Sequence, residues 1–282
     1  MRTDDPRSLL RGAGLRAKKS FGQNFLVADH VARAIAAACV PDDEVGCARV
    51  VEIGAGTGSL TRWLADRART VIAIERDRDL VPLLEREIAS TDRVRVVEAD
   101  ARSSDLAGLL GGPDPGSPRV LCGNLPYSLT GPLLRSAVAV ASSVDRVVFM
   151  VQDEVASRLL ATPSTKEWGA LTVFVRAAFD ARRLLRAPPA AFHPQPEVTS
   201  AVVVLSPLRP RRADETPRLR ALVRGAFEAR RKTLRNAWAA LAPDGRALEA
   251  AAARAGVSLD ARGETLDVEA FARMAQALDE PG

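Results

Sequence analysis

The sequence of 282 residues contains few of the side chains from which metal sites, disulfide frameworks and proton relays are usually built. Its three cysteines, Cys39, Cys47 and Cys122, form no C-x-x-C pair, which disfavours both a disulfide framework and a cysteine zinc site. Histidine occurs only as His30 and His193. We therefore expect no metal centre and no histidine-based acid–base catalysis.

Long apolar runs are missing as well. No early apolar stretch resembles a signal peptide, and nowhere do about 18 apolar residues follow one another. The composition, 47% hydrophobic and 27% charged, is that of a folded chain, and the length favours one large domain plus a smaller one. We expect a cytoplasmic, monomeric protein without membrane contact.

Basic residues are concentrated in two segments. The formal net charge is +5, yet residues 1–20 carry +4 and residues 205–235 carry +7, so the rest of the chain is negative. We predict that both segments contact an acidic partner such as nucleic acid, although such runs are also typical of solvated helix faces. If one helix continued through the second segment, four of its arginines would share an arc of about 60°. The candidate contacts are Lys18, Lys19 and Lys232 together with those four arginines, Arg220, Arg224, Arg231 and Arg235.

Apolar runs of strand length alternate with amphipathic, helix-like segments through most of the chain. This alternation predicts a mostly parallel sheet covered by helices. The last two strand candidates follow each other without a good helix between them, which predicts an antiparallel pair at one edge. The expected strands are residues 49–53, 70–75, 93–98, 119–123, 146–151, 171–179 and 198–205, and the expected helices include 60–67, 79–90 and 132–141.

Strand signals stop after residue 207, and from about Thr216 the pattern is helical to the end, with Pro217 suited to a first helical turn. We therefore expect an α/β, Rossmann-like domain over residues 1–206 that includes the basic arm. A small all-helical domain should follow over residues 207–282.

A glycine-rich turn follows the first expected strand, where residues 52–58 read E-I-G-A-G-T-G. Glycines such as Gly54 and Gly56 let the backbone turn sharply and let a ligand lie against main-chain N–H groups. A dinucleotide fingerprint, G-x-G-x-x-G, would place its third glycine at position 59, where this chain has serine. The loop thus argues against a phosphate cradle.

Carboxylates end the next two expected strands. Glu75 lies about 20 positions past the loop, where an acidic side chain can accept both hydroxyls of a ribose. Asp100 follows the third strand and reaches the same edge of the sheet. Taken alone, either is compatible with a solvated loop acid. With the loop, they describe a nucleoside pocket that requires no phosphate, which fits S-adenosylmethionine better than a dinucleotide.

The sharpest signal follows the fourth expected strand, where residues 124–127 read Asn-Leu-Pro-Tyr. An exocyclic amine on an aromatic ring is a poor nucleophile because its lone pair is delocalised. The oxygen of Asn124 and a main-chain carbonyl, with Leu125 as candidate, could accept both N–H bonds and direct the lone pair at a sulfonium methyl. Pro126 would fix the backbone and Tyr127 would stack on the base. An amide is no useful base, so we expect the proton to leave to water.

A second aromatic residue, Phe192, stands in a proline-stiffened loop before the last expected strand. It could pack on the other face of an extruded base and so belong to the catalytic site. It could equally anchor the loop in the core, and the sequence leaves both interpretations open.

The ordered motifs resemble those of the RNA adenine N6-dimethyltransferases, and within them the bacterial small-subunit ribosomal RNA dimethylases of the KsgA/RsmA family. The similarity runs from about Lys18 through the rest of the chain. The motifs that carry it are K-K-S-F-G-Q-N-F-L at 18–26, V-E-I-G-A-G-T-G at 51–58, N-L-P-Y at 124–127, F-M-V-Q-D-E-V at 149–155, F-H-P-Q-P-E-V-T-S at 192–200 and F-E-A-R-R-K-T-L-R-N at 227–236.

This resemblance implies a class I methyltransferase fold, S-adenosyl-L-methionine as cofactor, and N6,N6-dimethylation of two adjacent adenosines in a 3′-terminal hairpin of small-subunit (16S) rRNA. It implies that Asn24, Leu26, Gly54, Glu75, Asp100 and Asn124 contact the cofactor, with Glu75 on the ribose, Asp100 on the adenine amine and Asn124 beside the methyl group. The chain departs from the family's pattern at Ser128, Trp168 and Gly263, where Asn, Tyr and a larger residue are usual.

Two other functions stay open. A resistance-type methylase that modifies a large-subunit rRNA adenine shares the loop and the Asn-Leu-Pro-Tyr chemistry. A non-catalytic ribosome assembly factor would keep the fold to bind RNA, but we expect its loop or tetrapeptide to be damaged, and both are intact here. The basic run at residues 230–236 favours the small-subunit interpretation.

Overall fold

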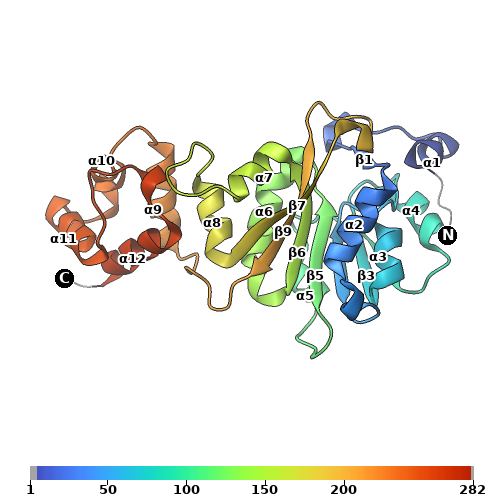
Figure 1. The fold of residues 1–282 in the computed structure, drawn as a ribbon, viewed down its shortest axis with the longest axis horizontal. Helices are drawn as coiled ribbons and strands as arrows, with labels where there is room; N and C mark the ends of the chain where they lie inside the picture. Colours follow the sequence, from blue (N-terminus) through green and yellow to red (C-terminus); the bar gives the residue numbers. More distant parts are fainter. Residues whose placement is uncertain (1–4, 281–282) are drawn as a thin grey trace. The chain divides into compact units, whose positions relative to one another are not determined.

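The computed structural model describes residues 5–280, except for the side chain of Lys19. These residues form two compact units (Figure 1). Unit 1 contains the described residues up to Ala156 together with Ala181–Pro207, and unit 2 contains Ser157–Asp180 together with the described residues from Leu208. Residues 157–180 thus group with the carboxyl-terminal helices and not with the sheet. The expected division of functions, with the chemistry in residues 1–206 and RNA contact in residues 207–282, stays a prediction.

A seven-stranded sheet forms the centre of unit 1. In spatial order its strands are β4 (Val94–Glu98), β3 (Thr70–Glu75), β2 (Arg49–Ile53), β5 (Arg119–Asn124), β6 (Arg146–Gln152), β9 (Ser200–Pro207) and β7 (Phe179–Ala187). Strands β2 to β6 run parallel, β9 runs antiparallel to β6, and β7 lies beyond β9 at the edge. The predicted mostly parallel α/β sheet with an antiparallel edge pair is confirmed.

Helices connect the parallel strands and cover the sheet. Val50, Val120 and Val148 lie at the same face of their strands and pack in one cluster with α2 and α3, which lie beside each other in Figure 1. This alternation is what brings the strand ends, and the loops that follow them, to one edge. The helices of unit 1 are α1 (Pro6–Gly12), α2 (Asp29–Cys39), α3 (Thr61–Arg67), α4 (Val81–Ile88), α5 (Leu106–Leu110), α6 (Thr130–Ala139) and the start of α7 (Asp153–Leu159).

A second, two-stranded sheet ties the amino-terminal segment to the proline-rich loop. Strand β1 (Phe25–Leu26) pairs antiparallel with β8 (Phe192–His193), and Leu26 lies opposite Phe192. The backbone N–H of Val27 also donates to the carbonyl of Ala191 at 2.8 Å. Residues more than 160 positions apart are therefore held together beside the strand ends.

The prediction of a strand at 171–179 is wrong, because these residues form helix α8 (Ala170–Ala178). The helix is buried on most of its sides, including Val173, Phe174 and Val175, so its sequence lacks the polar face that marks an amphipathic helix. The edge strand is the next segment, β7, whose arginines interrupt the apolar pattern that is typical of a strand.

Unit 2 is otherwise helical, with α9 (Pro217–Glu228), α10 (Leu234–Trp238), α11 (Gly245–Ala255) and α12 (Val268–Asp279). Its core centres on Trp238, whose indole meets the ring of Phe271 edge-on at 6.1 Å and whose Nε1–H donates to the Leu222 carbonyl at 2.9 Å. A Cβ at Gly263 would come within 2.6 Å of the Ala226 Cβ, so the larger residue usual in the family does not fit here. No helix among the described residues is long and apolar enough to cross a bilayer.

The single basic helix expected over residues 220–235 does not form. Helix α9 ends at Glu228 and α10 begins at Leu234, which places Arg231 and Lys232 in the turn between them. The N–H groups of Leu234 and Arg235 donate to the carbonyls of Ala261 and Leu259, not to the carbonyls four residues earlier as they would in a continuous helix. The predicted arc of four arginines on one helix is therefore wrong.

One carboxyl group lies inside the sheet. Glu52 stands in β2 between Ala73 and Cys122 of the neighbouring strands, and only 1% of its surface is exposed. Its Oε2 has no hydrogen-bond partner among the described residues. Burial is the main cause that raises the pKa of Glu52 to about 7, and the nearby Glu75 carboxylate acts in the same direction.

This burial predicts a pH-dependent stability. The folded state favours protonated Glu52, so the free energy of unfolding should fall as pH rises from about 4.5 to about 7, the unfolded and folded pKa values of this group. Glu52→Gln removes that loss, so denaturant titrations should show the variant gaining about 2–3 kcal/mol over wild type between pH 5 and pH 8. Glu85→Gln, at an exposed position of α4, is the control and should track wild type. A wild-type-to-Gln difference that does not change with pH would contradict the assignment.

Candidate active site

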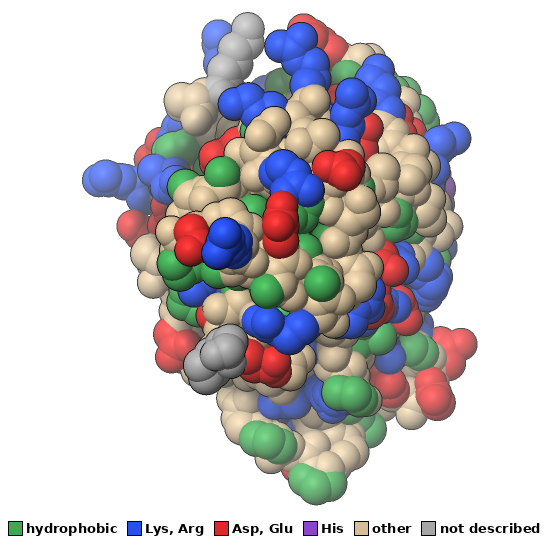
Figure 2. Space-filling model, turned by 90° about the vertical axis from the view of Figure 1, so that its left-hand side faces the viewer, with side chains coloured by type: hydrophobic (Ala, Val, Ile, Leu, Met, Phe, Trp, Pro, Cys, Tyr) green, Lys and Arg blue, Asp and Glu red, His purple; other side chains and the backbone are tan. Residues whose placement is uncertain are grey.

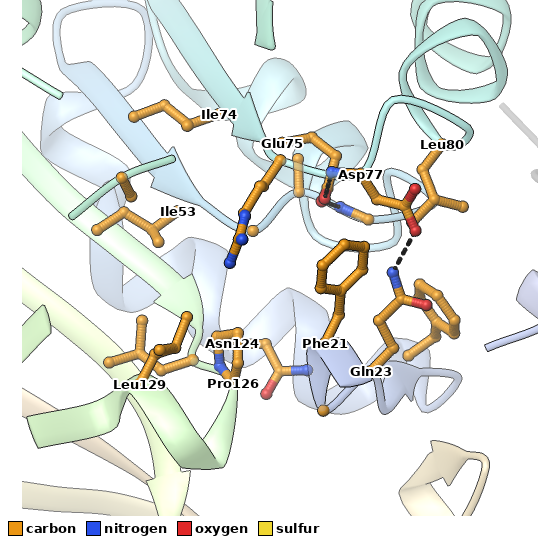
Figure 3. A pocket seen from close by; sticks show the side chains of 18 of the residues that line it. Phe21, Gln23, Ile53, Ile74, Glu75, Asp77, Leu80, Asn124, Pro126 and Leu129 are labelled. Carbon is orange, nitrogen blue, oxygen red and sulfur yellow. Dashed lines mark hydrogen bonds between the residues drawn. The ribbon is translucent and has the colours of Figure 1, made fainter. Parts of the chain in front are cut away.

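Four parallel strands end at one cavity (Figure 3). Its lining comes from the residues after β2, β3, β4 and β5, and the amino-terminal segment from Ser20 to Leu26 supplies a further wall. The sequence-predicted residues that the structure brings together there are Asn24, Leu26, Gly54, Gly56, Glu75, Asp100, Asn124, Leu125, Pro126 and Tyr127. All cofactor and tetrapeptide candidates therefore share one space, and their roles stay predictions.

Glycines in the turn after β2 have a backbone conformation that other residues rarely adopt. The φ angles of Gly54, Gly56 and Gly58 are +72°, +58° and +80°. A Cβ at Gly56 would also meet the Phe25 ring at 3.2 Å. The turn can therefore pass close under the cavity only with glycine at these positions.

Glu75 is held in place by main-chain donors. Its Oε2 accepts from the Gly56 N–H at 2.7 Å, its Oε1 accepts from the Asp77 N–H at 2.8 Å, and the residue is 8% exposed. Burial raises the pKa of Glu75, whereas these backbone donors oppose the shift. Because each carboxylate oxygen has a second lone pair, the anchored group can still accept hydroxyl donors from a ligand.

Asp100 is the second carboxylate of the cavity. Its Oδ2 lies 2.6 Å from Nη2 of Arg102 and 3.5 Å from Nε of Arg76. The hydrogen bond from Arg102 is the main reason that the pKa of Asp100 falls to about 2. The group is thus ionised at neutral pH and remains an acceptor, as binding an adenine amine requires.

Asn124 is oriented from across the cavity. Its Nδ2 donates to the main-chain carbonyl of Asn24 at 2.9 Å, which assigns the donor end of the amide to the amino-terminal segment. The acceptor end, Oδ1, is then left for another partner. Gly123 before it cannot carry a side chain, because a Cβ would lie 2.3 Å from the Ile53 carbonyl oxygen.

Tyr127 has a partner that the sequence did not reveal. Its hydroxyl lies 2.8 Å from the hydroxyl of Ser200, the fully buried first residue of β9. Burial raises the pKa of Tyr127, so it stays a neutral phenol. The ring is thus tied at its far end while it lines the cavity. Ser200 closes the F-H-P-Q-P-E-V-T-S motif, but only the fold brings it to Tyr127.

Phe192 differs from the catalytic expectation. It does not line the cavity; its side chain is 1% exposed and packs in the core cluster that includes Leu26 and Ala191. Pairing of β8 with β1 turns the ring into that cluster. The core-anchor interpretation therefore fits this structure, and stacking on a base does not.

Several predicted nucleic-acid contacts are already paired within the protein. Lys18 lies 2.5 Å from Asp77 and 2.6 Å from Asp79, and Arg235 lies 2.5 Å from Glu249. Arg220 donates to the Glu215 carbonyl at 3.0 Å. Figure 2 likewise shows basic and acidic side chains intermixed on the visible face.

Three of the predicted cations remain. Arg224, Arg231 and Lys232 are exposed, and no ion pair joins them to another described residue. The side chain of Lys19 lies outside the described residues. Nor do any three His, Cys, Asp or Glu side chains of residues 5–280 gather in a group that could hold a metal ion.

Comparison with known proteins identifies the family. Residues 14–280 match the family described as ribosomal RNA adenine dimethylase. The chain is 40% identical to Ribosomal RNA small subunit methyltransferase A of Geobacter metallireducens, over 95% of this chain and 98% of that protein. It is 43% identical to the protein of the same name from Anaeromyxobacter sp. strain K, over 97% of each.

Solved structures share the fold. A dimethyladenosine transferase from Plasmodium falciparum superposes with a TM-score of 0.74 at 22% identity, over 89% of this chain and 95% of that one. The 23S rRNA methyltransferase ErmE gives a TM-score of 0.65 at 26% identity, over 91% and 100%. Motifs, cavity and relatives agree, and the chain belongs to the ribosomal RNA adenine dimethylase family.

Proposed function

We propose that this protein transfers methyl groups from S-adenosylmethionine to N6 of two adjacent adenosines in a 3′-terminal hairpin of 16S rRNA, as a step in the biogenesis of the small ribosomal subunit. The observation that carries the proposal is the anchored Asn124 amide, which borders the same cavity as the Glu75 and Asp100 carboxylates. The near-full-length relatives named for the small subunit support the choice of substrate.

The cavity residues fit this cofactor. Glu75, with both oxygens fixed by backbone N–H groups, would accept the ribose hydroxyls, and the ionised Asp100 would accept from the adenine amine. Gly54 would lie under the amino-acid part of the cofactor. A Cβ at this position would come within 3.8 Å of the Asn124 carbonyl oxygen and would occupy space beside it. Leu26 and Asn24 would close the remaining side. When bound, S-adenosylmethionine supplies a methyl group on a positively charged sulfur.

Asn124 and its neighbours would prepare the nucleophile. The Asn124 oxygen and the Leu125 carbonyl accept the two N–H bonds of the adenine amine, so its lone pair is withdrawn from the ring and aimed at the methyl carbon. Pro126 holds the backbone at φ −56°, and Tyr127 offers its ring to the base. No general base is needed, because the proton leaves to water. Alignment of this kind can contribute about 7–11 kcal/mol.

Contact with the RNA backbone would come from the basic segments. Arg224, Arg231 and Lys232 of unit 2 are exposed cations without an ion-pair partner among the described residues, as phosphate contacts require. We propose that residues 207–282 hold the rRNA while residues 1–206 carry the chemistry. The enzyme would act in the cytoplasm as a monomer, without a metal.

The resistance-type alternative has one observation in its favour, the likeness to ErmE over the full length of that structure. That likeness is at 26% identity, against 40–43% for the small-subunit relatives. A non-catalytic assembly factor would need neither the fixed amide nor the ordered carboxylates that line this cavity.

Labelling both ribosomal subunits tests the reaction and the substrate together. The enzyme is incubated with methyl-labelled S-adenosylmethionine and with purified small or large subunits that lack the corresponding modification. We expect label in the small subunit, as dimethyladenosine at two adjacent positions of the 3′-terminal hairpin, mapped by nuclease digestion and mass spectrometry. Label in 23S rRNA would favour the resistance-type activity, and no label in either would favour the assembly factor.

Asn124→Ala tests the mechanism. The variant should lower kcat by at least about 100-fold, as does loss of one preorganised polar group in other active sites. Binding of S-adenosylhomocysteine, measured by calorimetry, should change much less. Asn124→Asp should also be impaired, since a carboxylate cannot donate to the Asn24 carbonyl and is repelled by it. A fully active Asn124→Ala enzyme would refute the role of the amide.

Paired and unpaired cations should differ in their effect on RNA binding. Neutralising Arg231 and Lys232 together should weaken binding to the small subunit and reduce the slope of log affinity against log salt by about 1.5–2. Arg235→Gln is the matched control from the same segment, and it should have a smaller effect because Arg235 already pairs with Glu249 and Asp260. An unchanged slope in the double variant would reject these contacts.

A further inference from the structure

We infer that Asp77 is a positioning residue: by binding Lys18 and Gln23 it holds residues 18–26 against the cavity, and so fixes the carbonyl that orients Asn124. This inference rests on the proposed function and assigns to Lys18 a role inside the protein instead of on RNA. Residues 18–26 are called the strap.

Asp77 is the fixed end of the connection. It is 3% exposed and follows Glu75 by two residues, in the turn after β3. Its Oδ1 lies 2.5 Å from Nζ of Lys18. Its Oδ2 accepts from Nε2 of Gln23 at 2.8 Å, as Figure 3 shows. Lys18 also reaches Asp79, at 2.6 Å. Two strap residues thus bind one buried carboxylate.

The strap is closed on itself at the same point. The backbone N–H of Lys18 donates to Oε1 of Gln23 at 2.8 Å, so the amide of Gln23 joins both ends of the turn to Asp77. The ring of Phe21 contacts two cations, with Lys18 Nζ 5.4 Å and the Arg76 guanidinium 5.2 Å from its centroid. The conformation of the strap therefore depends on the carboxylate that it grips.

From Gln23 the connection runs directly to the catalytic amide. Asn24 is the next residue, and its carbonyl accepts from Nδ2 of Asn124 at 2.9 Å. Beyond it, Phe25 and Leu26 pair with β8 and fix the other end of the strap. A strap released from Asp77 would be free to shift between this sheet and α1. The Asn24 carbonyl would then no longer be held in position to accept from Asn124.

Asp77 also faces the ribose side of the cavity. Its own N–H donates to Oε1 of Glu75 at 2.8 Å. The turn that presents the ribose carboxylate is thus the turn that grips the strap. Releasing the strap should therefore weaken cofactor binding and slow methyl transfer at saturating cofactor, because both groups depend on this turn.

Lys18→Gln tests the inference in the full-length enzyme. We expect the Kd for S-adenosylhomocysteine to rise about tenfold, as for loss of a charge-assisted hydrogen bond, and kcat to fall by a similar factor. The KM for small subunits and its salt dependence should stay at the wild-type values. Lys18→Arg keeps the cation and should restore most of both losses.

Two further variants separate positioning from folding. Gln23→Leu should reproduce the losses of Lys18→Gln, which keeps the inference testable if the lysine variant fails to fold. Arg67→Gln breaks an arginine–aspartate pair with Asp42 that does not line the cavity, and it should leave both constants unchanged. Thermal unfolding of every variant identifies any loss that follows from stability alone.

The results that would contradict the role of Asp77 differ from the result that would contradict the proposed function. If Lys18→Gln raises the KM for small subunits and lowers its salt slope by about one while cofactor binding is unchanged, Lys18 is a phosphate contact and the inference fails. It also fails if kcat stays at the wild-type value, because the strap then does not orient Asn124. Should the wild-type enzyme methylate neither subunit, the proposed function fails, yet the S-adenosylhomocysteine titrations still decide whether Asp77 holds the strap.

Discussion

The hydrogen bond from the Asn124 amide to the Asn24 carbonyl decides what the cavity can do chemically, because an amide has one donor end and one acceptor end. With one N–H of Nδ2 bound to the protein, the orientation of the amide is fixed and its Oδ1 remains as an acceptor for another group. An adenine amine, which has two N–H bonds, can donate one of them to this acceptor. The fold must therefore bring together two segments that lie 100 residues apart in the chain.

A parallel sheet meets this requirement at its carboxyl edge. Gly54, Glu75, Asp100 and Asn124 stand at or just after the ends of β2, β3, β4 and β5, so four short-range sequence signals converge without any local contact between them. The sequence predicted this convergence because strand periodicity and the direction of the strands follow from residues close to one another. The position of the strap is not predictable in this way, because the sequence K-K-S-F-G-Q-N-F-L does not indicate which carboxylate it binds.

Three features of the fold depend on contacts between residues far apart in the sequence. The apolar sequence of α8 predicts a strand, because burial on most sides removes the polar face that marks an amphipathic helix. Phe192 was compatible with two roles, and only the pairing of β8 with β1 shows that its ring belongs to the core. The break between α9 and α10 depends on hydrogen bonds to residues 259 and 261, which no local pattern contains. In each case the deciding contact is distant in sequence.

The limit of prediction from sequence is clearest for the charged residues. The excess of positive charge in two segments follows from the sequence, but charge that is counted along the chain is not charge that a partner meets. Lys18 and Arg235 each face two carboxylates from elsewhere in the fold, whereas Arg231 and Lys232 lie exposed in a turn and pair with no carboxylate of the described residues. A cation beside carboxylates presents less net positive charge to a phosphate than an unpaired cation does. Arg224, Arg231 and Lys232 should therefore contribute more to RNA affinity than the paired cations do.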